Sequence, residues 1–278
     1  MLSRRAFLGS SAAATVAPSL LAAKRVPVGL EMFSVRDQLK ADLPGTVKAV
    51  AKIGYQDLEF FSPYFEWTPA QAKDVRKVMD DSGIRCVSTH NGTKSFSPEG
   101  LGHAIELNQI LGSKMIIMAS AGKVTDAEGW KGVAERLSAA SEKLKGVGMR
   151  SGFHNHQFEF MPLPTGEKPI EILAKNTPKE VVLQMDVGTV LFAKQDPVAW
   201  IKANPGRIVS MHLKDWSSDP GKGFEVMFGD GSAPWKKIFE AAEEVGGVES
   251  YLIEQEGGSV PPMETAARCL ANFKKLRA

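Results

Sequence analysis

Short apolar runs alternate with longer segments of helical periodicity from residue 26 to the end of the chain, and this pair recurs eight times. The runs at 115–119 and 181–187 are apolar almost throughout, which is typical of parallel strands covered on both faces. The pattern predicts an α/β protein with a single (β/α)8 TIM barrel over residues 24–278. The expected strands are Val26–Val35, Asp57–Phe61, Arg85–His90, Met115–Ala119, Arg150–His156, Val181–Val187, Ile208–Asp215 and Ser250–Glu256.

Helices are expected after each strand, and several have clear start and stop signals. Thr68, Ser97 and Asp196 each precede a proline, a pair that favours the first turn of a helix. Glycines at positions 54, 83, 112 and 148 follow apolar-periodic segments, where a left-handed residue ends a helix. An open doubly wound sheet is the alternative, but no glycine-rich phosphate turn follows an early strand. The expected helices lie near residues 44–53, 69–82, 98–111, 126–147, 169–176, 197–203, 235–245 and 261–276.

Residues 1–23 are expected to form an export signal that is not part of the barrel. Arg4 and Arg5 stand before Phe7 and Leu8, which matches the twin-arginine pattern of proteins that fold before they cross a membrane. The small residues at the end of the segment suit a signal peptidase. The mature chain is therefore predicted to be periplasmic, or otherwise exported by the twin-arginine route. No other segment approaches the roughly 20 apolar residues of a membrane span, so no membrane contact is expected after signal removal.

Composition narrows the classes of function. The chain has 278 residues, of which 43% are hydrophobic, enough for a sizeable core. It carries 34 basic and 32 acidic residues, and loss of Arg4 and Arg5 leaves 32 of each. A neutral chain offers no basic surface, so nucleic acid is not expected as a partner. Cys86 and Cys269 are expected as buried free thiols, and a homo-oligomer remains open.

Ionisable side chains end most of the expected strands. In a barrel of this class the carboxyl ends of the strands build the active site. Four of the five histidines lie there, together with carboxylates whose burial is costly without a compensating cation. These groups predict a metal site of mixed nitrogen and oxygen ligands, which suits Mn, Co, Fe or Zn better than Ca or Mg. The strand-end groups are Glu31, Glu59, His90, His154, His156, Asp186, His212, Lys214, Asp215, Glu254 and Glu256.

Alternation along a strand refines this set, because residues two positions apart face the same way. At least one side chain of each such pair is expected to reach the metal. Where only one does, the other would touch substrate or orient a ligand. The pairs are His154 with His156, His212 with Lys214, and Glu254 with Glu256.

The same residues carry a resemblance to a known family. Glu59 and His90 are followed by the runs at 153–160, 184–188, 210–215 and 252–256, and residues 228–239 match a common loop-to-helix segment. In this order they resemble the xylose isomerase-like TIM barrel superfamily, the sugar phosphate isomerase/epimerase family. The resemblance covers essentially residues 26–276.

The resemblance implies one divalent cation, with Mn, Co or Zn expected. In the family it is held by a carboxylate ending strand five, an Asp ending strand six, a His ending strand seven and a Glu ending strand eight. This chain has a histidine where many members have the strand-five glutamate, and His156 or Glu159 is the alternative ligand there. By position, the expected ligands are His154, Asp186, His212 and Glu254.

The resemblance also implies a mechanism. In the family's epimerases two metal-bound glutamates flank the substrate carbon and exchange its proton through an enediolate. Here Glu254 is expected as one base, while His156 or Glu159 would serve the other face. Such an unequal pair suits proton transfer between different positions, or β-elimination, better than symmetric epimerisation. Lys214 is expected to act as an electrophilic or substrate-binding cation.

The leading prediction is a divalent-metal-dependent sugar isomerase or epimerase that abstracts a proton next to the carbonyl of a ketose or related polyol. The first alternative is a metal-dependent lyase or hydratase on 3-keto-glycosides or inosose-like keto-sugars, because the strand-five histidine pair resembles that branch. The second is a catalytically inactive sugar-binding barrel. A DNA-repair endonuclease of related fold is not expected, because it would need a basic face and the mature chain is neutral. The residues expected to contact the small-molecule carbohydrate are Glu59, His90, Phe33, Trp67 and Trp216.

Overall fold

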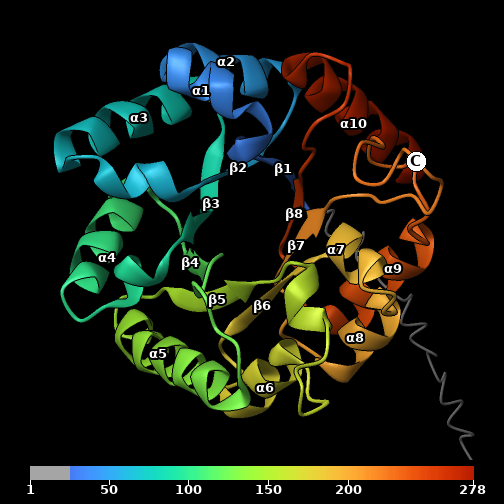
Figure 1. Cartoon of the computed structure of the whole chain (residues 1–278). Coiled ribbons are helices and arrows are strands. Elements are labelled where there is room, and N and C mark those ends of the chain that lie inside the picture. The colour runs from blue at the N-terminus through green and yellow to red at the C-terminus, as the bar shows by residue number, and fades with distance from the viewer. Residues whose placement is uncertain (1–25) are drawn as a thin grey trace, which may run out of the picture.

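The computed structural model describes residues 26–278, and its eight parallel strands close into one barrel. The predicted (β/α)8 TIM barrel is thereby confirmed. Each strand pairs with its sequence neighbours, and the first strand closes against the last (Figure 1). The export signal predicted for residues 1–23 lies outside the described residues. The strands are β1 (Val28–Glu31), β2 (Asp57–Phe60), β3 (Arg85–Asn91), β4 (Met115–Met118), β5 (Arg150–His154), β6 (Val182–Asp186), β7 (Ser210–Leu213) and β8 (Ser250–Ile253).

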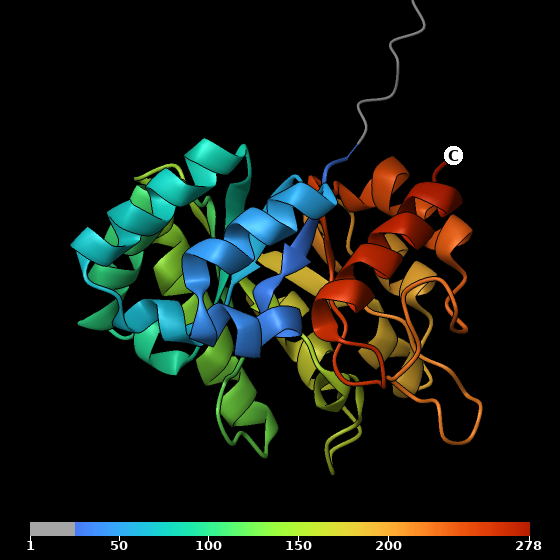
Figure 2. The same cartoon turned by 90° about the horizontal axis from the view of Figure 1, so that it is seen from above.

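Helices surround the barrel in both views (Figures 1 and 2). In residues 26–278 no helix combines the length and the apolar character needed to cross a membrane. Short 3-10 turns η1 (Met32–Val35), η2 (Ser62–Glu66), η3 (Thr93–Phe96) and η4 (Gln157–Phe160) follow strands, and the π-helical turn η5 (Ala242–Gly246) extends α9. The α-helices are α1 (Arg36–Ala41), α2 (Leu43–Ile53), α3 (Pro69–Ser82), α4 (Gly100–Leu111), α5 (Ala127–Lys145), α6 (Pro169–Asn176), α7 (Val187–Phe192), α8 (Pro197–Ala203), α9 (Trp235–Ala241) and α10 (Pro262–Leu276).

The predicted helix caps are formed by side chains at the expected positions. Thr68 and Gln71 make a reciprocal capping box at the start of α3. Asp196 accepts hydrogen bonds from two backbone N–H groups of α8. Ser97 also acts at a helix start, but α4 begins two residues later than predicted, and the Ser97 hydroxyl accepts from the N–H of Gly100 at 3.0 Å. Local side-chain chemistry therefore fixes these helix starts.

The strand ends differ from prediction where a side chain bonds to the next turn. The first strand was expected to reach residue 35, but β1 ends at Glu31, whose carboxylate accepts the N–H of Phe33 at 2.7 Å and starts η1. In the same way, Asp186 ends β6 and caps α7 by accepting the N–H of Thr189 at 3.1 Å. Neither α1 nor α7 was predicted. Such bonds compete with the sheet ladder and turn the chain out of the strand.

Alternation along the strands places apolar groups outside and charged groups inside. Leu58 and Phe60 of β2 belong to the core between strands and helices, whereas Glu59 between them contacts histidines of other strands. A smaller apolar cluster fills the barrel interior and includes Ile117 and Val182. Cys86 and Cys269 are buried free thiols, as predicted. The interior of the barrel is thus polar at the carboxyl ends of the strands and apolar below them.

A cavity of about 740 Å³ opens at the opposite, amino-terminal end of the strands. Its lining includes Asp57, Arg85, Arg150 and Glu249. Arg85 pairs with Asp57 at 2.6 Å and Arg150 pairs with Glu249 at 2.5 Å, so these four charges are satisfied within the protein. The strand-end groups that the sequence singled out for chemistry do not line this cavity.

Candidate active site

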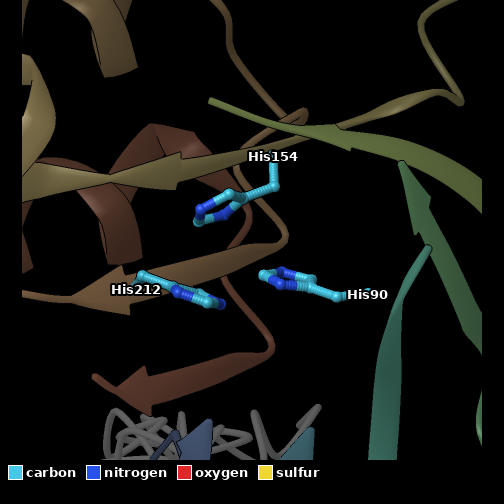
Figure 3. Close-up of side chains that lie close together, drawn as sticks. All are labelled: His90, His154 and His212. Atoms are coloured by element: carbon cyan, nitrogen blue, oxygen red, sulfur yellow. The ribbon is translucent and has the colours of Figure 1, made fainter. Parts of the chain in front are cut away.

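Three histidines from three strands meet at the carboxyl end of the barrel. His90 of β3, His154 of β5 and His212 of β7 are all buried. Their ring centroids lie 4.5 Å apart for His90 and His154, 4.4 Å for His154 and His212, and 5.0 Å for His90 and His212. Figure 3 shows the three rings converging from separate strands. The structure therefore gathers side chains that are up to 122 positions apart in the sequence.

Glu59 holds two of these rings from within the barrel. Its Oε1 lies 2.7 Å from Nε2 of His212 and 2.9 Å from Nε2 of His90. Its Oε2 accepts from the Gln184 amide at 2.8 Å and from the hydroxyl of Ser88. Burial alone would raise the pKa of Glu59, but the two histidines hold the pKa below its usual value. Glu59 thus orients His90 and His212, and its predicted contact with substrate stays a prediction.

Glu254, which follows β8, is held between a histidine and a lysine. Its Oε2 lies 2.5 Å from Nδ1 of His212, and its Oε1 accepts from the Lys214 ammonium at 3.1 Å. Lys214 also pairs with Glu256 and lies 3.9 Å from Oδ2 of Asp186. Burial opposes ionisation of Glu254, yet the Lys214 charge and the hydrogen bond to His212 lower its pKa well below the ordinary value. Glu254 is therefore an anionic base candidate.

Within residues 26–278, two buried polar atoms beside Glu254 have no hydrogen-bond partner: Nδ1 of His154 and Oδ2 of Asp186, the latter 3.9 Å from the Lys214 ammonium. Ligand atoms of His154, Asp186 and Glu254 all lie within 4.8 Å of one another. Burial raises the pKa of Asp186 to about 7, although Lys214 opposes this shift. Unpaired buried polar atoms are costly, and a divalent cation would satisfy both of them. These residues therefore fit a metal ion, and His212 adjoins them because its ring contacts the Glu254 carboxylate.

His156 and Glu159 lie just beyond β5 and differ in placement. The His156 ring stands edge-on to His154 with centroids 5.0 Å apart. Burial lowers the pKa of His156 to about 4, so its imidazole is neutral near pH 7. Glu159 accepts the backbone N–H of His156 at 2.7 Å and so stabilises the turn η4. His156 is thus next to the cluster, whereas the Glu159 carboxylate is engaged with backbone.

Aromatic side chains stand on two sides of the mouth. Phe33, which follows β1, packs edge-on against Phe61 with centroids 5.3 Å apart. Trp216, which follows β7, packs edge-on against Phe192 at 6.2 Å. The Lys214 ammonium lies 5.5 Å from the centroid of the Phe224 ring, which joins the Phe192 side of the group. Phe33 and Trp216 therefore lie at the rim, and their contact with a sugar stays a prediction.

Two other aromatic residues belong to packing layers. Trp67 packs edge-on against Phe60 and Tyr64, with centroids 5.1 and 6.1 Å away, and both partners belong to the core outside the strands. Phe228 is fully buried and packs against Trp235 at 4.6 Å, so it is not a rim residue. The substrate contact expected of Trp67 is untested, although its neighbours are those of a packing residue.

The structure adds one polar residue, Gln184, that was not assigned to the site from the sequence. The Gln184 amide bonds Glu59 at 2.8 Å and the Ser210 hydroxyl at 2.9 Å, and its oxygen lies 2.7 Å from Nε2 of His90. A signal was present, because Gln184 is a polar residue inside an apolar run and lies two positions before Asp186. Gln184 therefore faces the interior and links β6 to the histidine cluster.

Asp215 ends the seventh expected strand but does not join the metal cluster. Its two carboxylate oxygens accept the backbone N–H groups of residues 216, 229, 231 and 233 and the indole N–H of Trp235. A Cβ atom at Gly231 would lie 2.2 Å from Oδ1 of Asp215, so only glycine allows this close approach. Asp215 thus shapes the long loop at residues 216–234, part of which stands out in orange in Figure 2.

Replacing Asp215 with alanine is expected to lower the free energy of unfolding by roughly 3 kcal/mol, because buried donors lose a charged acceptor. Urea denaturation followed by circular dichroism measures the change. The control is Asp219→Ala in the same loop, where the acid pairs with Lys222 at the surface and the expected change is below about 0.5 kcal/mol. Equal stabilities for the two variants would contradict the role of Asp215.

Comparison with known proteins finds relatives that are described as inosose dehydratases. The chain is 24% identical to an inosose dehydratase of Clostridium perfringens over 254 residues, which cover 84% of this chain and 82% of that enzyme. It is 26% identical to an inosose dehydratase of Clostridium tetani over 159 residues. The second match covers 51% of this chain and spans about half, 52%, of that relative's length.

Solved structures share the fold. A protein of Parabacteroides distasonis described as a sugar phosphate isomerase/epimerase is 26% identical, with a TM-score of 0.76 and coverage of 91% of this chain and 95% of that one. An L-ribulose 3-epimerase is 18% identical, with a TM-score of 0.69 and coverage of 91% and 94%, a similarity of fold alone. The sequence model of the xylose isomerase-like TIM barrel family matches residues 47–276. The chain therefore belongs to the xylose isomerase-like TIM barrel family.

Proposed function

We propose that this protein is a divalent-metal-dependent sugar isomerase or epimerase that removes a proton next to the carbonyl of a ketose or related polyol. The observation that carries the proposal is the placement of Glu254. This anionic carboxylate lies between His212 and Lys214, beside the unpartnered atoms of His154 and Asp186. A base, a fixed cation and a set of metal ligands thus meet at one point of the barrel mouth.

Each residue is assigned a role from its contacts. His154, Asp186, His212 and Glu254 would hold the ion, which when bound supplies polarisation of a carbonyl oxygen. Glu254 accepts the substrate proton through the oxygen that faces Lys214. The Lys214 ammonium stabilises negative charge that develops on a substrate oxygen, because it is buried and stays protonated.

His156 is proposed as the second proton-transfer group. Its neutral imidazole neighbours His154, and we assign it the exchange of a proton with the second face of the substrate. Glu159, the other candidate, has one carboxylate oxygen engaged with the backbone of His156. We therefore assign Glu159 to the support of His156.

A lyase or dehydratase is the second candidate, and the asymmetry of the site favours it. Glu254 is a carboxylate whereas His156 is a neutral imidazole, so the two faces of a substrate would meet different groups. Glu254 would take the proton beside the carbonyl. The neighbouring carbon would then lose water or an aglycone alcohol, and the proton that Glu254 has taken up returns to the leaving oxygen. The inosose dehydratase relatives agree with this outcome.

One experiment separates these functions. Mature protein loaded in turn with Mn, Co or Zn is incubated in D₂O with ketoses, inososes and 3-keto-glucosides, and the products are followed by NMR. Deuterium beside the carbonyl with an intact carbon skeleton is expected for the isomerase or epimerase. Loss of water or release of an aglycone would establish the lyase instead. Binding without exchange for every metal would identify a sugar-binding barrel and overturn both enzymatic functions.

We also propose that the chain is exported, as Arg4 and Arg5 indicate. In a bacterial host with a twin-arginine system, the full-length protein is expected in the periplasm after loss of residues 1–23. Replacement of both arginines by lysine is expected to retain it in the cytoplasm, while replacement of Lys24 by arginine serves as the control. Cell fractionation measures the distribution, and equal export of the two variants would contradict the proposal.

A further inference from the structure

We infer that Glu31, Glu59 and His90 form a second divalent-cation site, separate from the ion held beside Glu254. The three residues come from the neighbouring strands β1, β2 and β3. One ligand atom from each lies within 4.8 Å of the other two, and all three residues are buried. Two carboxylates and an imidazole suit Mn²⁺, Co²⁺ or Zn²⁺.

Glu31 supplies the observation that points to a ligand. One of its oxygens accepts the N–H of Phe33 at 2.7 Å, while the other, Oε1, is buried and has no hydrogen-bond partner in residues 26–278. Glu31 is only 1% exposed, so this oxygen has no access to bulk water. A buried carboxylate oxygen without a donor is costly, and a cation is the partner that matches its charge.

The other two residues of this site, His90 and Glu59, are already in contact. Nε2 of His90 lies 2.9 Å from Oε1 of Glu59, and a cation would replace the proton that this contact shares. The candidate metal site of the proposed function shows the same arrangement, in which His212 contacts Glu254 and an unpartnered oxygen of Asp186 lies nearby. Each of the two clusters therefore contains a histidine–carboxylate contact beside a carboxylate oxygen that accepts no hydrogen bond within residues 26–278.

The charge of the Lys214 ammonium is directed to the residues around Glu254. Lys214 pairs with Glu254 and Glu256 and lies 3.9 Å from Asp186, and within residues 26–278 no ion pair joins it to Glu31. The negative charges of Glu254 and Glu59 both act on Glu31. An ion held beside Glu254 would therefore leave the unpartnered oxygen of Glu31 without a cation, and a second ion would supply one.

The second site lies beside the first. The rings of His90 and His212 stack with centroids 5.0 Å apart and an interplanar angle of 11°, and Oε1 of Glu59 reaches both rings. Two-metal enzyme sites have ions about 3.5–4 Å apart, and such pairs bind two oxygens of one substrate. The pair of ions would thus favour substrates with neighbouring oxygen atoms, and Glu59 and His90 would reach the substrate through the ion.

Metal stoichiometry tests the inference. Purified mature protein is saturated with Mn²⁺, dialysed, and measured by elemental analysis, with circular dichroism as the check on folding. Two ions per chain are expected for the parent and one for Glu31→Gln, an isosteric change that keeps an acceptor for Phe33. The control is Gln38→Ala, which removes another buried unpartnered oxygen outside the cluster and is expected to retain two ions. One ion per parent chain would overturn the inference.

A second measurement needs no variant. Electron paramagnetic resonance of the Mn²⁺-loaded parent is expected to show the spectrum of two exchange-coupled ions, whereas only the six-line signal of an isolated ion would overturn the inference. The proposed function is judged separately by deuterium exchange. Exchange with one ion per chain would reject the second site and keep the proposed function, while two ions without exchange on any substrate would do the reverse.

Discussion

Glu254→Gln is expected to slow deuterium exchange into substrate by about 10³-fold or more, the size of effect that loss of a general base produces. The amide keeps an oxygen that can remain beside Lys214 or the metal, but it cannot accept the substrate proton. The charge that Lys214 and the His212 contact stabilise in the folded protein disappears with the substitution. NMR of substrate in D₂O measures the rate with metal resupplied in excess.

The matched control for this prediction is Glu256→Gln. Glu256 contacts the same lysine, but its side chain is 37% exposed and it is not among the candidate ligands. Its replacement is expected to change the exchange rate by less than about tenfold, as expected of a contact at the edge of the site. If both variants kept their metal and Glu254→Gln exchanged deuterium at the parent rate, Glu254 would have no part in the mechanism.

Asp186→Ala and His212→Ala are each expected to lose one metal ion per chain relative to the parent while remaining folded. Asp186 contributes the unpartnered oxygen of the cluster, and His212 contributes the ring nitrogen that lies 2.5 Å from Glu254. Removal of a first ligand is expected to weaken binding by more than the 10–100-fold typical of changes in outer partners. Elemental analysis after dialysis measures the metal, and circular dichroism measures the fold.

Asp57→Asn provides the control for metal loss. Asp57 is a fully buried carboxylate in the same barrel, but its partners are Arg85 and Ser250 at the opposite end of the strands. The variant is expected to retain the parent's full metal content, because the candidate ligands are untouched. Full retention of metal in both Asp186→Ala and His212→Ala would refute the assigned site.

The order and type of the main elements were predictable because their signals are local. Residues 115–119 were expected as a strand and Met115–Met118 form β4, since a short apolar run needs no distant partner to be recognised. Proline and capping side chains likewise located α3 and α8 at the predicted starts. The family resemblance, which the comparison confirms, rests on such runs and on the polar residues that end them.

Strand ends were harder to predict, because two local forces compete there. The apolar pattern continues past Glu31 into residues 32–35, yet the carboxylate of Glu31 accepts a backbone N–H and starts a 3-10 turn. Asp186 ends β6 and begins α7 in the same way. Hydrophobic periodicity reports burial, but it does not report which backbone N–H a carboxylate will accept.

The eight-fold alternation and the positions of ionisable residues at strand ends follow from the order of residues along the chain, because both depend on sequence neighbours. The partners of those ionisable residues follow from the way the strands close into a barrel. Glu59 contacts His212 across 153 positions, and Lys214 contacts Glu254 across 40. Asp215 accepts hydrogen bonds from the backbone of its own loop, while Oε1 of Glu31 has no hydrogen-bond partner in residues 26–278. Closure of the barrel sets these distances, and a linear pattern of residues carries no information about which strand ends will meet.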